Sequence, residues 1–157
     1  MGARIHVERV SALPRLPSER SLREWARAAL AGRREDAELC LRVVDEAEMQ
    51  ELNGRYRGKD YATNVLSFPA DLPRGVTLPL LGDIVLCAPV LRREAREQHK
   101  PERAHWAHLV VHGTLHLLGL DHQRPRQASH MEGLERRILG AMGLPDPYTP
   151  TPADTAR

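Results

Sequence analysis

The fold is built around one stretch of sequence, residues 101–122, which is PERAHWAHLVVHGTLHLLGLDH. Pro101 suits the first turn of a helix, where its missing N–H would have no partner in any case, and the pattern predicts a helix to about Leu118. Gly119 follows directly, and glycine readily takes the left-handed conformation that ends a helix in a sharp turn. We therefore expect a central helix, after which the chain turns back toward the last turns of that helix.

Shorter elements precede and follow this helix. Runs of β-favouring residues bounded by proline or glycine predict four strands, at residues 5–10, 39–44, 63–68 and 81–87. Apolar positions at helical spacing, together with capping residues, predict four more helices, at residues 19–31, 45–54, 89–98 and 127–142. Because the strands come early and the helices late, we expect an α+β fold with about four strands and five helices.

The second predicted helix has signals at both ends. Asp45 and Glu48 form a pair that resembles a capping box, and Asn53-Gly54 is expected to close the helix. The segment YRGKD at residues 56–60 is polar and contains glycine, so it predicts a loop.

Length and composition indicate a single domain. The chain has 157 residues, of which 41% are hydrophobic and 28% charged, and this supplies enough apolar surface for one compact core. We expect the domain to span residues 1–146 and to be followed by a flexible tail, rich in Pro and Thr, at residues 147–157. No stretch approaches the roughly 18 uninterrupted apolar residues that a membrane-spanning helix needs.

The first residues and the cysteines bear on the cellular compartment. His6 and Glu8 stand where the apolar core of a secretion signal would lie, so we expect a cytoplasmic protein. Cys40 and Cys87 fall within predicted strands, and we expect small core side chains rather than a disulfide or a pair of ligands.

The charge balance is too mild to predict a nucleic-acid-binding protein by itself. Lys and Arg together number 23 against 21 Asp and Glu, which gives a net charge of +2. Aromatic residues make up only 4%, so a surface on which bases stack is not indicated. Any contact with RNA would have to be made through phosphate, for which arginine offers a bidentate guanidinium.

Three histidines in the central stretch have the spacing of a metal site. His112 and His116 are four residues apart on the predicted helix, so their side chains stand about 6 Å apart on one face. The turn at Gly119 can bring His122 back toward the same ion. Three imidazole ligands leave one position open for water, which is typical of catalytic zinc. We expect one Zn²⁺ per chain, and the same ligands also suit Ni²⁺ or Fe²⁺.

The same spacing occurs in metzincin proteases, but one essential group is missing. Those enzymes need a carboxylate directly after the first histidine as general base, and Gly113 holds that position here. Asp121 is the nearest alternative carboxylate, and we expect it to orient a ligand in preference to acting as a base or capping the turn. His108 lies one turn before His112; packing or surface exposure is the commoner role for such a residue, and support of a ligand is the alternative.

Several segments together resemble the YbeY family of bacterial metal-dependent endoribonucleases, also called rRNA maturation factors. The motifs are HGTLHLLGLDH at 112–122, YRGKD at 56–60, TNVLSFP at 63–69 and LGDI at 81–84. The resemblance implies a mixed four-stranded sheet, a zinc ion bound by three histidines, and a role in 16S rRNA 3′-end maturation and ribosome quality control. It also implies RNA of the 30S or 70S ribosome as partner, with ribosomal or GTPase assembly proteins as further candidates.

The resemblance assigns residues as well. It places the metal on the three histidines His112, His116 and His122, and it places the functionally important arginine of the family on Arg57. A guanidinium near a metal ion can hold the oxygens of a phosphodiester as their negative charge grows during cleavage. The neighbouring cations provide two candidate auxiliary phosphate contacts, Arg55 and Lys59.

The sequence leaves two alternatives to a nuclease. The first is a ribosome-associated assembly factor in which the metal mainly ties the turn to the body of the protein, and the missing carboxylate at Gly113 keeps this alternative open. The second is a metallopeptidase, which the same missing carboxylate disfavours.

Overall fold

The computed structural model describes residues 2–76 and 78–148. In these residues the chain forms four strands, β1 (Arg4–Arg9), β2 (Glu38–Val44), β3 (Val65–Pro69) and β4 (Leu80–Cys87). The five helices are α1 (Glu19–Leu30), α2 (Glu46–Arg57), α3 (Ala88–Glu97), α4 (Glu102–Leu117) and α5 (Pro125–Ala141). The predicted α+β class is confirmed, with strands early and helices late in the chain.

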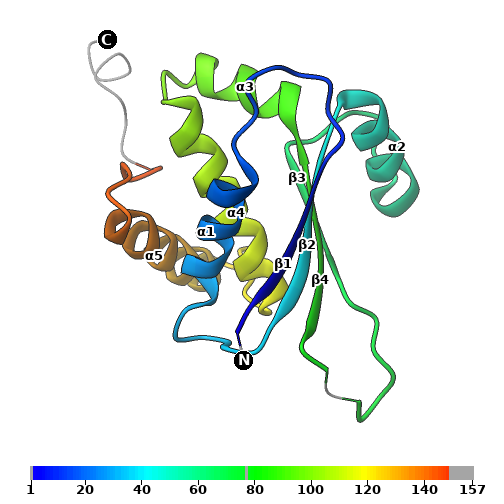
Figure 1. Cartoon of the computed structure of the whole chain (residues 1–157), viewed down its shortest axis with the longest axis vertical. Helices are drawn as coiled ribbons and strands as arrows, with labels where there is room; N and C mark the ends of the chain where they lie inside the picture. Colours follow the sequence, from blue (N-terminus) through cyan, green and yellow to red (C-terminus); the bar gives the residue numbers. More distant parts are fainter. Residues whose placement is uncertain (1, 77, 149–157) are drawn as a thin grey trace.

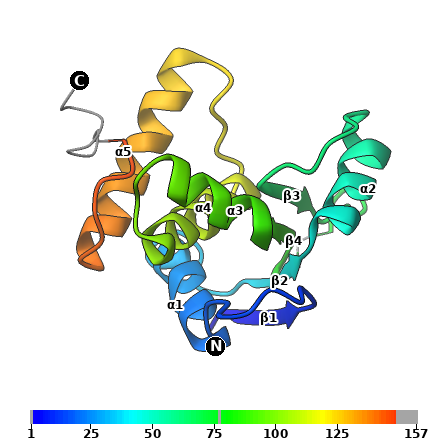
Figure 2. The same ribbon diagram turned by 90° about the horizontal axis from the view of Figure 1, so that it is seen from above.

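The four strands form one mixed sheet in the order β1-β2-β4-β3. β2 runs parallel to both β1 and β4, whereas β3 pairs with β4 in the antiparallel direction. Figures 1 and 2 show α1, α4 and α5 on one side of this sheet and α2 on the other side. The sheet is therefore the mixed four-stranded one that the family resemblance implies.

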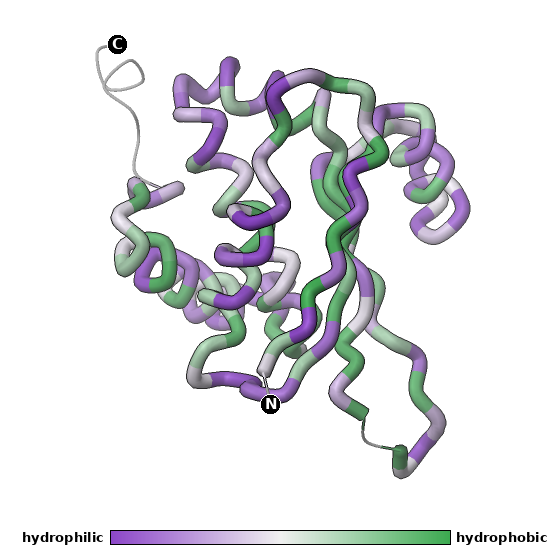
Figure 3. The backbone as a smooth tube through the Cα atoms, in the orientation of Figure 1, coloured by the Kyte–Doolittle hydropathy of each residue, from purple (hydrophilic) through white to green (hydrophobic). Residues whose placement is uncertain are grey.

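The main hydrophobic core lies between the sheet and the helices α1 and α4. Trp25 of α1, Leu41 of β2, Ile84 of β4 and Leu115 of α4 are all almost completely buried in it. A smaller cluster around Met49 fills the space between α2 and the opposite face of the sheet. In Figure 3, which colours the backbone by residue hydropathy, α2 is mostly hydrophilic. α4 contacts α1, α3, α5, β3 and β4, so it is the central helix of the fold, as predicted.

α2 is longer than the sequence predicts. The Asn53-Gly54 pair does not close it; the helix continues to Arg57 and ends at Gly58, which has the left-handed conformation (φ 67°). Asn53 is fully buried and its side-chain amide donates to the carbonyl of Tyr61 at 2.8 Å. Because this tertiary hydrogen bond occupies the side chain that would otherwise compete with the helical backbone, the helix passes through a pair that commonly ends one.

The predicted capping box at the start of α2 is also wrong. Asp45 is the N-cap residue, but its side chain makes no hydrogen bond with the helix. The carboxylate instead accepts hydrogen bonds from the Ser11 hydroxyl and from the N–H of Ala12, and these lower the pKa of Asp45. Glu48 pairs with Arg42 of β2 at 2.6 Å. Both carboxylates therefore tie neighbouring segments together, which spacing along one helix could not reveal.

The other predicted boundaries agree to within a few residues, and α5 begins earlier than expected because Pro125 occupies its first turn. Cys87 is buried and Cys40 half-buried in their strands, and both are free thiols. No helix among the described residues is long and apolar enough to cross a membrane.

The expected tail falls partly outside the described residues. Pro147 and Tyr148 are described, and each makes a hydrogen bond with an earlier part of the chain, with Lys100 and Glu135 respectively. Residues 149–157 lie outside the described part.

Candidate metal centre

α4 ends in the turn that the sequence predicts. Gly119 takes the left-handed conformation (φ 96°), and its N–H donates to the carbonyl of His116 at 2.9 Å. The N–H of Leu120 donates to the carbonyl of Leu115 at 3.1 Å, and the two bonds together form a Schellman motif. This reversal of the chain places His122 beside the helix that has just ended.

Three imidazole rings meet at this end of α4. The ring centroids lie 4.6 Å apart for His112 and His116, 4.8 Å for His116 and His122, and 5.3 Å for His112 and His122. One ligand nitrogen from each ring lies within 4.8 Å of the other two. The structure thus brings together the three residues that the sequence predicts as ligands.

His112 and His116 fit a metal ion by the distance between their nitrogens, and His116 also by its protonation state. The Nε2 atoms of His112 and His116 are 3.2 Å apart, and two nitrogens bound to one tetrahedral Zn²⁺ at about 2.0–2.1 Å would lie about 3.3 Å apart. Burial and the nearby imidazoles of His112 and His122 lower the pKa of His116, which favours the neutral form that binds metal. The described residues could therefore hold a metal ion, and three imidazoles suit zinc, nickel and iron alike.

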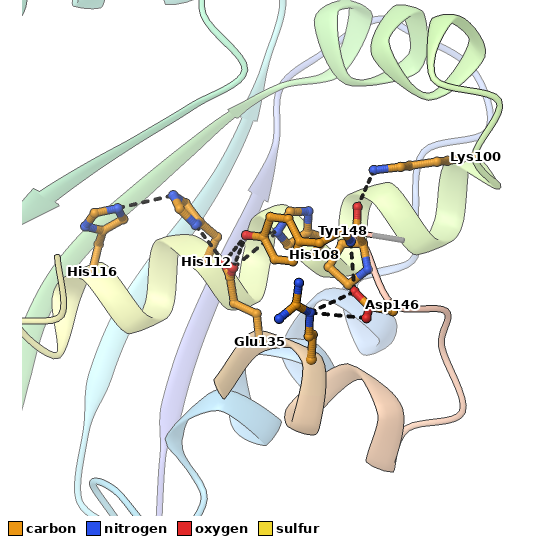
Figure 4. A network of polar contacts seen from close by, with 9 residues as sticks. Lys100, His108, His112, His116, Glu135, Asp146 and Tyr148 are labelled. Atoms are coloured by element: carbon orange, nitrogen blue, oxygen red, sulfur yellow. Dashed lines mark hydrogen bonds and ion pairs between the residues drawn. The ribbon is translucent and has the colours of Figure 1, made fainter. Parts of the chain in front are cut away.

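His112 is backed by a buried carboxylate from α5. Glu135 is completely buried, and its Oε1 lies 2.9 Å from His112 Nδ1. His108 Nε2 lies 3.3 Å from Oε2, and the Tyr148 hydroxyl donates to the same oxygen at 2.6 Å (Figure 4). Burial by itself would raise the pKa of Glu135, but the hydrogen bonds from His108, His112 and Tyr148 outweigh it and lower the pKa to about 2. His108, His112 and Glu135 therefore form a hydrogen-bonded cluster behind the three rings.

The residue after His112 has no room for a side chain. A Cβ atom at Gly113 would lie 2.9 Å from Ile84 Cγ2 and 3.2 Å from the Ser67 hydroxyl oxygen. Gly113 faces the sheet, where α4 packs closely against β3 and β4. A carboxylate could not occupy this position without displacing Ile84, so close packing against the sheet disfavours the metzincin general base here.

A cleft of about 650 Å³ opens in front of the histidines. Its lining includes Arg57, Asn64, Ser67, His112, His116 and His122. Here the end of α4 and its turn (His112, His116, His122) are called the histidine wall. The end of α2 and the strand entering the sheet (Arg57, Asn64, Ser67) are called the arginine wall. Segments that are far apart in the sequence therefore face one cavity.

The three predicted phosphate contacts are placed differently. Arg57 is the last residue of α2, is exposed, and lines the cleft. Arg55 is exposed and forms an ion pair with Glu51 one turn earlier, at 2.8 Å. Lys59 is exposed beyond the helix end at Gly58. Neither Arg55 nor Lys59 is part of the cleft lining in the described part of the chain.

The two predicted supporting residues also differ in what they contact. Asp121 lines the cleft, and its Oδ1 accepts a hydrogen bond from the N–H of His122, the neighbouring candidate ligand, at 2.7 Å. His108 contacts Glu135 and the Tyr148 hydroxyl rather than another histidine's ligand nitrogen. Its ring also packs edge-on against that of His112, with 6.1 Å between the ring centres, and both rings contact the Glu135 carboxylate.

Sequence reasoning missed Glu135 and Tyr148. One signal for Glu135 is present, because it stands four residues after Met131 and three before Ile138 on the predicted apolar face of α5. A carboxylate on a face that is otherwise buried needs hydrogen-bond donors from another element. Tyr148 has no such signal, since it falls in the segment predicted to be a flexible tail.

The fold and the site together define an α+β protein with three clustered histidines, suited to a metal ion, at a cleft that also contains an arginine. The family model described as endoribonuclease YbeY matches residues 11–143. The chain therefore belongs to the YbeY family.

Comparisons with individual proteins agree with this family membership. Endoribonuclease YbeY of Xanthomonas campestris pv. campestris is 62% identical over 143 residues, which cover 87% of this chain and 89% of the relative. Endoribonuclease YbeY of Stenotrophomonas maltophilia is 61% identical over the same length and with the same coverage. The solution structure of TM1509 from Thermotoga maritima has a TM-score of 0.57 and 23% identity, and the match covers 94% of this chain and 99% of that one. This last likeness shows a shared fold.

Proposed function

We propose that this protein is a zinc-dependent endoribonuclease that cuts single-stranded RNA and acts in 16S rRNA 3′-end maturation and ribosome quality control. Membership of the YbeY family and the names of the close relatives support endoribonuclease activity and an RNA substrate. The free cysteines are compatible with a reducing cytoplasm. The 30S or 70S ribosome and its assembly proteins are the proposed partners.

One observation carries the chemical part of the proposal: the histidine wall and Arg57 face the same cleft. A Zn²⁺ held by the three imidazoles would act as a Lewis acid on a phosphate oxygen and lower the pKa of a water molecule. The Arg57 guanidinium binds the other phosphate oxygens and stabilises their growing charge. A peptide bond has less need of such a cation.

The size and polarity of the cleft support a single-stranded substrate. Its volume of about 650 Å³ is that of a pocket for a small ligand, which suits a short single-stranded segment. Asn64 and Ser67 on the arginine wall supply neutral polar groups beside the cation. The Ser67 hydroxyl also donates to the carbonyl of Gly113 at 3.2 Å, which ties the two walls together.

Gly113 favours one alternative, the assembly factor with a structural metal. No carboxylate can stand after His112, so a general base must come from elsewhere, and the histidines could instead hold an ion that braces the turn. In that case zinc removal would lower the melting temperature and ribosome association, and purified protein would not cut RNA. The same lack of room at Gly113 argues against a metallopeptidase of the metzincin type.

Elemental analysis combined with a cleavage assay tests the proposal. We expect about one zinc per chain and cleavage of a labelled single-stranded RNA that spans the 16S rRNA 3′ end. Cleavage should stop when a chelator removes the metal and return when Zn²⁺ is added. A protein that holds zinc yet leaves this RNA intact would support the assembly factor instead, and cleavage of an unstructured protein would support the peptidase.

A further inference from the structure

The three candidate ligand histidines differ in the hydrogen-bond partner of the second ring nitrogen. His112 Nδ1 lies 2.9 Å from Glu135 Oε1, whereas its Nε2 lies 3.2 Å from His116 Nε2. Among the described residues, neither His116 nor His122 has a carboxylate on its second ring nitrogen. The fold therefore provides a fixed partner behind one ring of the cluster.

This contact decides which nitrogen of His112 is free for a metal. A carboxylate accepts hydrogen bonds, so a neutral His112 ring must carry its proton on Nδ1 to pair with Glu135. Its Nε2 atom is then unprotonated and directed toward His116. An isolated neutral histidine has no such constraint, because either nitrogen can hold the proton.

Glu135 is in turn held by Tyr148, which follows α5. The Tyr148 hydroxyl donates to both carboxylate oxygens, at 3.0 Å and 2.6 Å. The preceding residue is fixed by Lys100, whose Nζ donates to the Pro147 carbonyl at 2.6 Å. The Arg136 guanidinium lies over the Tyr148 ring, 5.2 Å from its centre. Figure 4 shows the contacts of His108, His112 and Tyr148 meeting at Glu135, with the Lys100 contact farther from it.

Stability alone does not account for this arrangement. A completely buried carboxylate must be removed from water, and its hydrogen bonds commonly do no more than offset that cost. An apolar residue of similar size would fill the same space between α4 and α5. What an apolar residue could not do is select the tautomer of His112 and fix its ring plane.

We propose that Glu135 and Tyr148 are positioning residues for the metal centre: Glu135 holds His112 in its Nδ1-protonated form, and Tyr148 holds Glu135. The inference rests on the three-histidine metal site of the proposed function. It makes Tyr148 part of the functional site, although among the described residues Tyr148 follows α5 and is not in the cleft lining.

Nuclear magnetic resonance of the full, metal-free chain tests the tautomer directly. Long-range ¹H–¹⁵N spectra of the histidine rings at pH 7.5 should show wild-type His112 with its proton on Nδ1. Glu135→Gln should shift His112 toward the other tautomer or a mixture, because an amide can present either a donor or an acceptor to the ring. A His112 proton found on Nε2 in the wild type would overturn the proposal before any metal is added.

Cobalt titration of the full chain tests the consequence. Co²⁺ absorbs visible light and is the probe here, with its dissociation constant taken from the absorbance change at 25 °C. Glu135→Gln should weaken binding about 10–100-fold and alter the absorption bands. Tyr148→Phe, which keeps the ring over Arg136, should weaken binding about 2–10-fold, as expected for the loss of one hydrogen bond.

A matched control variant distinguishes the positioning role of Glu135 from the effect of its negative charge. Glu132 lies one turn before Glu135 on α5 and forms no hydrogen bond with a histidine in the described residues. Glu132→Gln removes the same charge and should bind Co²⁺ like the wild type. Equal affinities for Glu135→Gln, Glu132→Gln and wild type would overturn the role of Glu135, and an unchanged Tyr148→Phe would overturn that of Tyr148.

The outcomes also distinguish this inference from the proposed function. A wild-type chain that binds no Co²⁺ and no Zn²⁺ would overturn the metal site and the positioning role together. A wild type that binds metal and cuts RNA, with a Glu135→Gln variant that binds equally well, would overturn the positioning role alone. If Glu135→Gln fails to fold, Tyr148→Phe carries the test, because it removes only one hydroxyl.

Discussion

The histidine wall and the arginine wall of the cleft are built in different ways. His112 and His116 stand on a helix packed between the sheet and α5, and a completely buried carboxylate holds His112 from behind. Arg57 is exposed on the last turn of α2, whose buried side rests on a smaller hydrophobic cluster. One wall is therefore fixed by packing and hydrogen bonds, and the other presents a long side chain that can adjust.

The difference suits what each wall is proposed to bind. A metal ion requires ligand atoms at fixed distances, so small errors in ring position lower its affinity. A phosphate on a single-stranded RNA arrives in many backbone conformations, and a flexible cation can follow it. We therefore expect mutations to have the largest effect at the metal ligands and smaller effects at residues farther from them.

The largest effect is expected from His116→Ala, which removes one imidazole from the cluster. Zinc affinity should fall by more than the roughly 10–100-fold that loss of an outer partner costs, because a direct ligand is lost. RNA cleavage should disappear with it. Elemental analysis and the cleavage assay measure both, and His130→Ala, an exposed histidine on α5, is the control that should change neither. Full zinc content in His116→Ala would contradict the histidine wall as a metal site.

Arg57→Ala should give the next largest effect and separate the two walls. We expect cleavage to slow by about 10²–10³-fold, the usual result of removing one group that stabilises developing charge, while zinc content stays unchanged. Arg57→Lys should recover part of the rate, since it restores the charge but not the bidentate contact. Single-turnover rates with saturating RNA provide the measurement, and an unimpaired Arg57→Ala would remove the arginine from the mechanism.

Gly113→Ala tests the close packing of α4, which carries part of the histidine wall, against the sheet. A helical alanine gains about 1 kcal/mol over glycine, but the added methyl group meets Ile84 and Ser67 at 2.9 and 3.2 Å, and overpacking costs about 1–3 kcal/mol. We expect a net loss of up to about 2 kcal/mol in the free energy of unfolding, measured by urea denaturation. Gly133→Ala on α5 is the matched control, because its Cβ meets nothing within 4 Å and only the helical gain remains.

The smallest effect is expected from Lys59→Ala. Lys59 is exposed and does not line the cleft in the described residues, so its charge acts on RNA through water. Its removal should change the dissociation constant for single-stranded RNA by less than about threefold at physiological salt. Fluorescence anisotropy with a catalytically impaired background, Arg57→Ala, measures it. A loss well above threefold would mean that the phosphate-binding surface extends beyond the cleft.

Much of this molecule can be predicted from local patterns. The strands, the central helix and the turn at Gly119 follow from spacings of a few residues, and so does the approach of His122 to His112 and His116. The end of α2 could not be predicted in this way, because Asn53 makes its hydrogen bond with Tyr61, outside the helix. Similarly, Asp45 serves Ser11 and Ala12 rather than its own helix.

The sequence by itself determined the α+β class and the set of three histidines, because both depend on periodicities and turns that a few neighbouring residues impose. Only the tertiary structure decided that Arg57 lines the same cleft as those histidines, that a side chain at Gly113 would meet Ile84 and Ser67, and that Glu135 and Tyr148 stand behind His112. These relations join residues from different elements. They depend on how α2, α4 and α5 pack around the sheet, which local spacing does not encode.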